Sequence, residues 1–138
     1  GESLLDLRDP YEVGKNVVKM ADNYDLVIFE YFLTDKTGHD QNWEMAERVI
    51  HTVERFIEGI HDAMDKTKHQ LIITSDHGNL ENLTTATHTA NPVPTYLYGK
   101  HTDSFKDKIF ALCDRVPLLY EKLGIEIELK WETVAKEE

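Results

Sequence analysis

The sequence predicts an α/β fold with a mainly parallel sheet and helices on both faces. Residues 26–33 form a nearly continuous apolar run, which suits a strand covered on both sides. Apolar residues between 43 and 64 recur at every third or fourth position, as in a long amphipathic helix. Two shorter apolar runs, 71–74 and 95–98, follow it, so strand and helix patterns alternate along the chain.

The elements follow in order. Asp9 and Pro10 read as an N-cap and a first-turn proline, so a helix is expected from there to about Tyr24. Glu30 is the one charged residue inside the first strand, and we expect it at an edge or beside a partner. Gly124 reads as a helix stop. The other expected elements are a helix at 41–66, strands at 71–74 and 95–98, helices at 105–113 and 116–123, and a charged tail that ends the chain.

The visible strands are few for this fold class, so a partial domain with one sheet edge missing is expected. We treat residues 1–138 as a single metal-binding domain. Its first residue, Gly1, is not methionine, which suggests a processed tag or the C-terminal piece of a longer chain.

Composition excludes several classes of protein. Acidic residues outnumber basic ones 26 to 15, and the net charge of −11 disfavours binding to nucleic acid or to an anionic membrane surface. No apolar run is long enough to span a bilayer. Cys113 is the single cysteine and cannot form an internal disulfide. We therefore expect a soluble protein of the cytoplasm.

Candidate metal ligands follow the expected strands. Asp35 and His39 follow the first strand, Asp76 and His77 follow the second, and His88 precedes the third. Ligands bind beyond the carboxyl ends of strands in open α/β sheets. A carboxylate and an imidazole four residues apart can reach one ion, and Gly38 would let the backbone bend tightly between them. These residues therefore predict a metal site with open positions.

Each of these features also has a structural interpretation. Asp-His-Gly-Asn often forms a turn, and a loop histidine such as His88 often bonds only to backbone. A metal-free α/β domain is accordingly one hypothesis. The other histidines lack a place at a strand end and are expected to have no site role: His51, His61, His69 and His101.

The strings DKTGHD, TSDHGN and HTANPVP, in this order, resemble the metal-binding half of the alkaline phosphatase superfamily. They are most similar to the metalloenzyme domain of cofactor-independent phosphoglycerate mutases and phosphopentomutases. The resemblance covers roughly residues 15–123. It implies an alkaline-phosphatase-like fold.

The resemblance also implies two divalent ions, manganese or zinc, in the complete site. It places Asp35, His39 and His88 on one ion, and Asp76 and His77 on the other. A nucleophilic serine or threonine and one more aspartate, both from an early strand with an Asp-Gly segment, would complete the second ion, and that strand is absent from this sequence. Ser75 lies inside a strand, and Thr84 follows DHGN where no nucleophile is expected. At least one ion is therefore expected here.

Two functional hypotheses follow. In the first, the chain is the metal-binding part of a phosphomutase-like or phosphatase-like enzyme that acts on a phosphorylated small molecule, and it is inactive by itself. In the second, it is a non-catalytic metal-binding module that associates with a partner chain through an exposed sheet edge. The sequence leaves the substrate open, and also the choice between mutase, phosphatase and other hydrolase chemistry.

Overall fold

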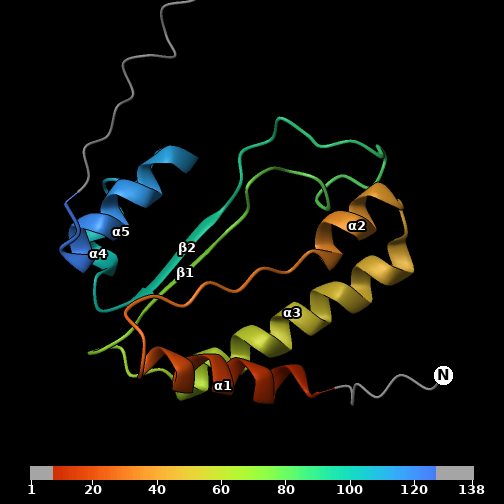
Figure 1. The fold of residues 1–138 in the computed structure, drawn as a ribbon. Helices are drawn as coiled ribbons and strands as arrows, with labels where there is room; N and C mark the ends of the chain where they lie inside the picture. Colours follow the sequence, from red (N-terminus) through yellow and green to blue (C-terminus); the bar gives the residue numbers. More distant parts are fainter. Residues whose placement is uncertain (1–7, 127–138) are drawn as a thin grey trace, which may run out of the picture. The chain divides into compact units, whose positions relative to one another are not determined.

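The structure is a computed structural model, and it describes residues 8–126. The chain divides into two compact units, one up to Thr102 and one from Asp103. The described residues of the first unit, 8–102, contain three helices and two strands before α4 begins at Thr102 (Figure 1). Their bounds are α1 Pro10–Ala21, α2 Leu33–His39, α3 Trp43–Ala63, β1 Gln70–Thr74 and β2 Thr95–Gly99.

Helices α1 and α3 confirm two of the predicted elements. The Asp9 carboxylate accepts a hydrogen bond of 3.1 Å from the Tyr11 N–H and caps α1, with proline in the first turn. Asn42 caps α3 in the same way, through a 2.9 Å bond from the Met45 N–H. The two helices pack against each other, and their apolar residues Val18 and Ile60 are buried. Both helices end about three residues before the predicted positions.

The strands differ from the prediction of a mainly parallel sheet. In the described residues, β1 and β2 form a two-stranded antiparallel sheet, with Gln70 opposite Gly99 and Thr74 opposite Thr95. A parallel pair requires a crossover that carries the chain back to the starting edge. Residues 75–94 form a long loop without a helix, so β2 returns directly beside β1. The fold is α/β, but its observed sheet is antiparallel.

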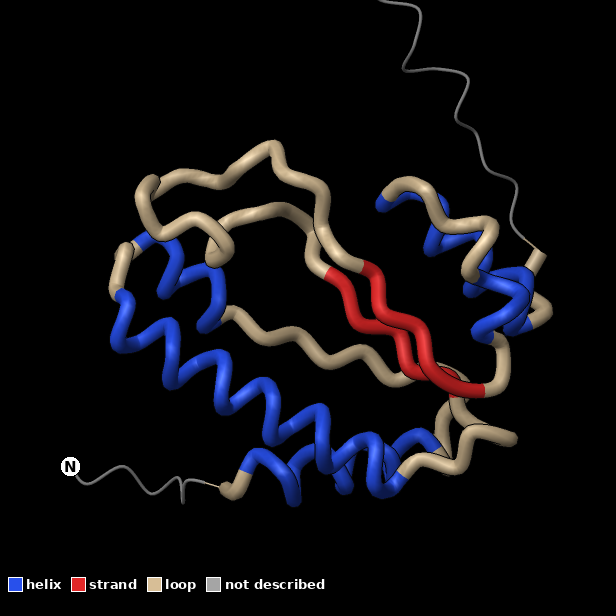
Figure 2. The backbone as a smooth tube through the Cα atoms, turned by 180° about the vertical axis from the view of Figure 1, so that it is seen from behind, coloured by secondary structure: helices blue, strands red, loops and turns tan. Residues whose placement is uncertain are grey.

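The apolar run at 26–33 is not a buried strand. Residues 26–31 run as an irregular segment between α3 and the strand pair, Phe32 already has α-helical backbone angles, and Leu33 begins α2 (Figures 1 and 2). Ile28 is 74% exposed and Phe32 is 72% exposed. Phe29 stacks on Phe56 of α3, with 4.5 Å between ring centroids. Within the described part of the chain no strand pairs with this segment, and most of its apolar side chains are exposed.

The second unit begins within α4 (Thr102–Phe105) and contains a 3-10 turn (Leu112–Asp114) and α5 (Arg115–Leu123). The predicted helix at 105–113 is wrong, because the chain leaves helical geometry after Phe105. The Asp114 carboxylate accepts bonds from the N–H groups of Phe110 and Ala111, at 2.9 and 2.7 Å, and so competes with a helix for these donors.

The end of α5 follows the prediction. Gly124 adopts a left-handed φ of 67° and terminates the helix. The predicted charged tail falls almost entirely on residues 127–138, outside the described residues. Among the helices that the structure describes, none is both long and apolar enough to cross a membrane.

Candidate metal centre

Helix α2 presents Asp35 and His39 together. The sequence predicted a tight turn here, whereas the structure contains a seven-residue helix. Residues four apart on a helix lie one turn above each other. The Nε2 atom of His39 accordingly lies 3.4 Å from Oδ1 of Asp35. The helix thus does what the turn was expected to do.

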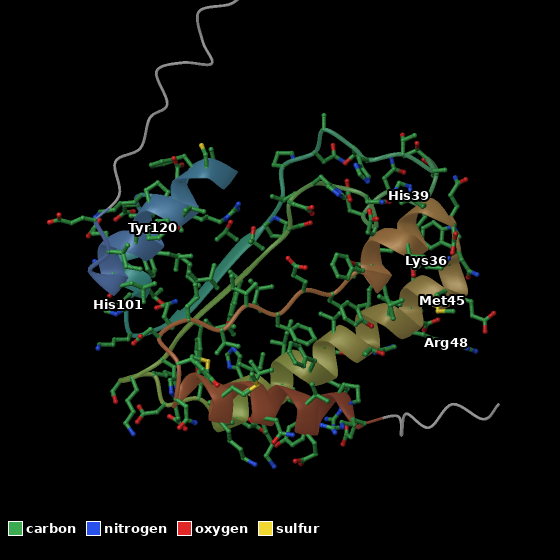
Figure 3. All side chains as sticks on the ribbon, viewed as in Figure 1. Lys36, His39, Met45, Arg48, His101 and Tyr120 are labelled. Carbon is green, nitrogen blue, oxygen red and sulfur yellow. The ribbon has the colours of Figure 1, made fainter. Side chains whose placement is uncertain are left out.

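His88 comes to this pair from the loop between β1 and β2. Its Nε2 atom lies 3.3 Å from Oδ1 of Asp35 and 3.1 Å from Nε2 of His39. The loop is held by a bond of 2.9 Å from the Thr89 N–H to the Gly78 carbonyl. Figure 3 shows His39 at the end of α2 that faces this loop. Donor atoms of Asp35, His39 and His88 therefore converge within 4.8 Å, although His88 lies 49 positions after His39 in the sequence.

The spacing of these donors suits one cation. Ligand atoms at about 2.0–2.2 Å from a shared ion lie roughly 3.0–3.6 Å from one another. The separations of 3.1, 3.3 and 3.4 Å fall in this range. One carboxylate and two imidazoles form a donor set typical of zinc or manganese. The residues present therefore fit a divalent ion.

The tautomer of His39 points the same way. Its Nδ1 lies 2.7 Å from the Ala86 carbonyl oxygen, which can only accept, so Nδ1 donates the hydrogen bond. In neutral His39, Nε2 then carries the lone pair and faces Asp35 and His88. A backbone acceptor on the far ring nitrogen is the usual support of a metal-bound imidazole.

Asp76 and His77 lie just beyond the end of β1, as expected. His77 Nε2 is 3.5 Å from Asp76 Oδ2 and 4.0 Å from Asp35 Oδ1. The His77 ring stacks on the His88 ring, with 3.6 Å between centroids and 18° between planes. Its Nδ1 is buried without a hydrogen-bond partner in the structure, whereas the Asp76 side chain is 85% exposed. All five candidate residues thus gather in one region, with Asp76 at its exposed rim.

Asn79 is a further site residue that was not among the candidates predicted from the sequence. Its side chain is buried, and its Nδ2 donates to Oδ1 and to the backbone oxygen of Asp35, at 2.7 and 3.3 Å. This bond, assisted by the nearby histidines His39, His88 and His77, holds the pKa of Asp35 below its ordinary value of 3.8. Its place in the DHGN string was the one available signal.

Substituting Asn79 by alanine is expected to raise the pKa of Asp35 in the metal-free protein. A carboxyl whose pKa is lower in the folded than in the unfolded state stabilises the fold at pH values above its unfolded-state pKa. This contribution to the free energy of unfolding is lost as the pH falls through the folded-state pKa. The variant should lose less stability on acidification. Carboxyl ¹³C NMR titration measures the shift, and Asp65, whose pKa is lowered by Thr67, serves as the internal control. An unchanged Asp35 titration would contradict the role of Asn79.

Gly38 has a different role from the predicted one. Its φ is not among the positive values in the described chain, so it does not supply a left-handed bend. A Cβ added there would instead overlap the side-chain amide of Asn79. Glycine therefore allows Asn79 to reach Asp35 across α2.

Other candidate groups lie outside this cluster. The Ser75 hydroxyl donates a 2.7 Å bond to the His77 carbonyl, and Thr84 donates to Asn82. His61 bonds Tyr96, His69 bonds Asp22 and His51 bonds Glu54. In the part of the chain that the structure describes, the Asp-His-His group contains none of the four histidines expected to lack a site role.

Comparisons with known proteins identify the family of this chain. The sequence profile of the Metalloenzyme superfamily matches residues 5–126. Among curated relatives, the chain is 32% identical over 125 residues to a 2,3-bisphosphoglycerate-independent phosphoglycerate mutase of Clostridium acetobutylicum, covering 84% of this chain and 24% of that protein. A protein of the same name from Ehrlichia canis is 32% identical over 109 residues, or 74% of this chain and 22% of the relative.

The same name applies to a relative from Methylobacillus flagellatus, which is 31% identical over 114 residues, or 78% of this chain and 22% of that protein. No solved structure matches the chain significantly. The chain spans about a quarter of the length of these relatives. The profile match covers most of the chain and includes every candidate ligand, so this chain belongs to the Metalloenzyme superfamily.

Proposed function

We propose that this chain is the metal-binding part of a phosphoryl-transfer enzyme of the phosphoglycerate mutase type. The observation that carries the proposal is the convergence of Asp35, His39 and His88 donor atoms within 4.8 Å. Membership of the Metalloenzyme superfamily and the mutase relatives favour phosphoryl transfer over other metal chemistry. The substrate class we propose is a phosphorylated small molecule.

In this proposal Asp35, His39 and His88 hold one manganese or zinc ion. Asp76 and His77 contribute to a second, weaker site. Such ions neutralise charge on a phosphoryl group and lower the pKa of an attacking hydroxyl when they are bound. Other residues of the chain orient the proposed ligands: Asn79 orients the Asp35 carboxylate, and the Ala86 carbonyl fixes the His39 ring. The net charge of −11 disfavours an anionic substrate at long range, so local positive charge has to hold it.

We propose that the nucleophile belongs to polypeptide outside these 138 residues. The chain matches about a quarter of each mutase relative, and the Ser75 hydroxyl is engaged with the His77 carbonyl. Among the described residues, the segment at 26–31 pairs with no strand, and it carries exposed apolar side chains such as Ile28. Such a segment suits pairing with a further strand, which would complete the sheet.

The exposed thiol of Cys113 suits a reducing compartment such as the cytoplasm.

The second candidate function is a non-catalytic metal-binding module that works with a partner chain. The segment at residues 26–31, which pairs with no strand among the described residues, favours it as well, because a separate protein could cover its exposed apolar side chains. Both functions use the same metal ligands. They differ in whether phosphoryl transfer accompanies metal binding.

The test uses the native gene product, isolated from its source cells, and its mass is compared with the 16.0 kDa of this chain. It is assayed with 3-phosphoglycerate and with p-nitrophenyl phosphate, before and after metal removal. The proposal expects a larger product whose metal-dependent phosphoryl transfer is lost in an Asp35→Ala variant. A product of this size that binds metal and turns over neither substrate would support the non-catalytic module instead.

A further inference from the structure

The carboxylate of Glu81 lies between the two loop segments that carry His77 and His88. Its Oε2 accepts a 2.6 Å hydrogen bond from the Asn79 N–H. Its Oε1 accepts from the Thr89 hydroxyl and, at 3.0 Å, from the Asn91 side-chain amide. One side chain thus joins the DHGN segment to the segment that follows His88.

The contacts between these two loop segments involve the residues that directly follow the two histidines. Gly78 follows His77 directly, and Thr89 follows His88 directly. The Thr89 N–H also donates a 2.9 Å bond to the Gly78 carbonyl, so backbone and side chain hold the two segments at the same point. The His77 and His88 rings stack immediately beside this junction. Moving either segment would therefore change the separation of the two imidazoles.

Glu81 also acts on Asp35 through Asn79. The Asn79 backbone is held by Glu81, while its side chain donates to Asp35 Oδ1 at 2.7 Å. The chain of contacts thus reaches the carboxylate of the Asp-His-His group as well as His88. A hydrogen bond to an ionised acceptor is stronger than one between neutral groups. The bonds from Thr89, Asn91 and Asn79 hold the pKa of Glu81 below its ordinary value, so it stays ionised at neutral pH.

The two loop segments pack closely where Gly78 meets Thr89 and Glu81. A Cβ added to Gly78 would overlap the Thr89 hydroxyl and would approach Glu81 Oε1 to 2.6 Å. The two segments therefore meet at backbone distance, with the Glu81 carboxylate filling the space beside them.

We infer that Glu81 is a positioning residue of the metal centre, which sets the placement of His77, His88 and Asp35 without itself binding the ion. The inference rests on the proposed function, because it requires that these residues bind metal. Partners in the second layer of a metal site typically change metal affinity by about 10–100-fold when removed. Glu81 occupies this layer for both loop segments at once.

The test compares Glu81→Ala and Glu81→Gln with the unaltered chain, by titration with Co²⁺ followed through its visible absorption spectrum. Alanine removes all three accepted bonds and should weaken Co²⁺ binding about 10–100-fold, with a changed spectrum. Glutamine keeps one oxygen for Thr89 and Asn91 but presents an NH₂ group to the Asn79 N–H, so a smaller loss is expected. Asp65→Asn is the matched control, because Asp65 likewise accepts from the backbone and hydroxyl of Thr67.

Thermal melting of the metal-free variants separates positioning from a purely structural role. A structural Glu81 would lower the melting temperature and leave the affinity and spectrum of bound Co²⁺ unchanged, which would overturn the inference. Should Glu81→Ala fail to fold, Thr89→Val removes one donor and is expected to weaken Co²⁺ binding in the same direction. Failure of the unaltered chain to bind Co²⁺ would instead contradict the proposed function.

Discussion

Replacing Asp35 with alanine is expected to lower the affinity of the chain for Mn²⁺ or Zn²⁺ by at least about 100-fold, the upper end of what second-layer changes cause. Asp35 supplies the one anionic donor of the Asp-His-His group. Its Oδ1 lies 3.3 Å from His88 Nε2 and 3.4 Å from His39 Nε2. Without it two imidazoles face each other at 3.1 Å with no negative charge to hold a cation.

Isothermal titration calorimetry measures this effect, and Asp40→Ala is its control. Asp40 follows α2 directly as its C-cap and pairs with Lys36 at 2.6 Å, so its loss removes an equal charge from the same helix without removing a proposed ligand. The control should bind metal as the unaltered chain does. Equal affinities of the Asp35 and Asp40 variants would mean that metal responds only to net charge, against the assignment of Asp35 as a ligand.

Replacing Gly38 with alanine is expected to lower metal affinity about tenfold or more although no ligand is removed, by the same reasoning as for other second-layer positions. The new Cβ would overlap the Asn79 side chain, whose amide orients Asp35. Asn79 is 4% exposed and has little room to move. The substitution therefore displaces the amide or tilts α2, and either change misplaces the carboxylate.

A double variant tests that route. Asn79→Ala removes the group that the new Cβ would meet, so adding Gly38→Ala to it should cost little further affinity. Additive losses in the double variant would show that Gly38 acts on the metal centre by another path. Metal affinity equal to that of the unaltered chain in Gly38→Ala alone would contradict the close approach itself.

Local sequence patterns predicted the start of α1 and the end of α5, whereas helix α2 was not predicted. Asp9 with Pro10 and Gly124 mark these helix ends through short-range hydrogen bonds and backbone preferences, which act within a few residues. The helix expected at 105–113 failed because one side chain, Asp114, bonds the backbone of Phe110 and Ala111. Periodicity alone does not detect such competition.

The sheet was harder to predict because its pairing depends on distant residues. The apolar run at 26–33 predicted a buried strand, yet a strand requires a neighbour, and the described residues supply none. The direction of β2 depends on the connection at 75–94, which has no helical crossover. Hydrophobicity indicates where a segment prefers to be buried and gives no information about its partner.

For the candidate metal centre, sequence indicated the groups but missed their support. Asp35, His39 and His88 were expected together, and the structure places their donor atoms within 4.8 Å. The spacing of Asp35 and His39 is compatible both with one helical turn and with a loop, so the predicted local structure around them was wrong. Asn79 and Glu81 make their contacts between segments that are distant in sequence or lie in irregular loops. Local residue patterns do not predict such contacts.

The most direct test of the metal centre is a crystal structure of the chain grown with Mn²⁺, with anomalous diffraction data collected at the manganese edge. The account predicts an anomalous peak at ligand distance from Asp35 Oδ1 and from the Nε2 atoms of His39 and His88. An anomalous peak only at other residues, or no peak in crystals grown with an excess of Mn²⁺, would contradict it.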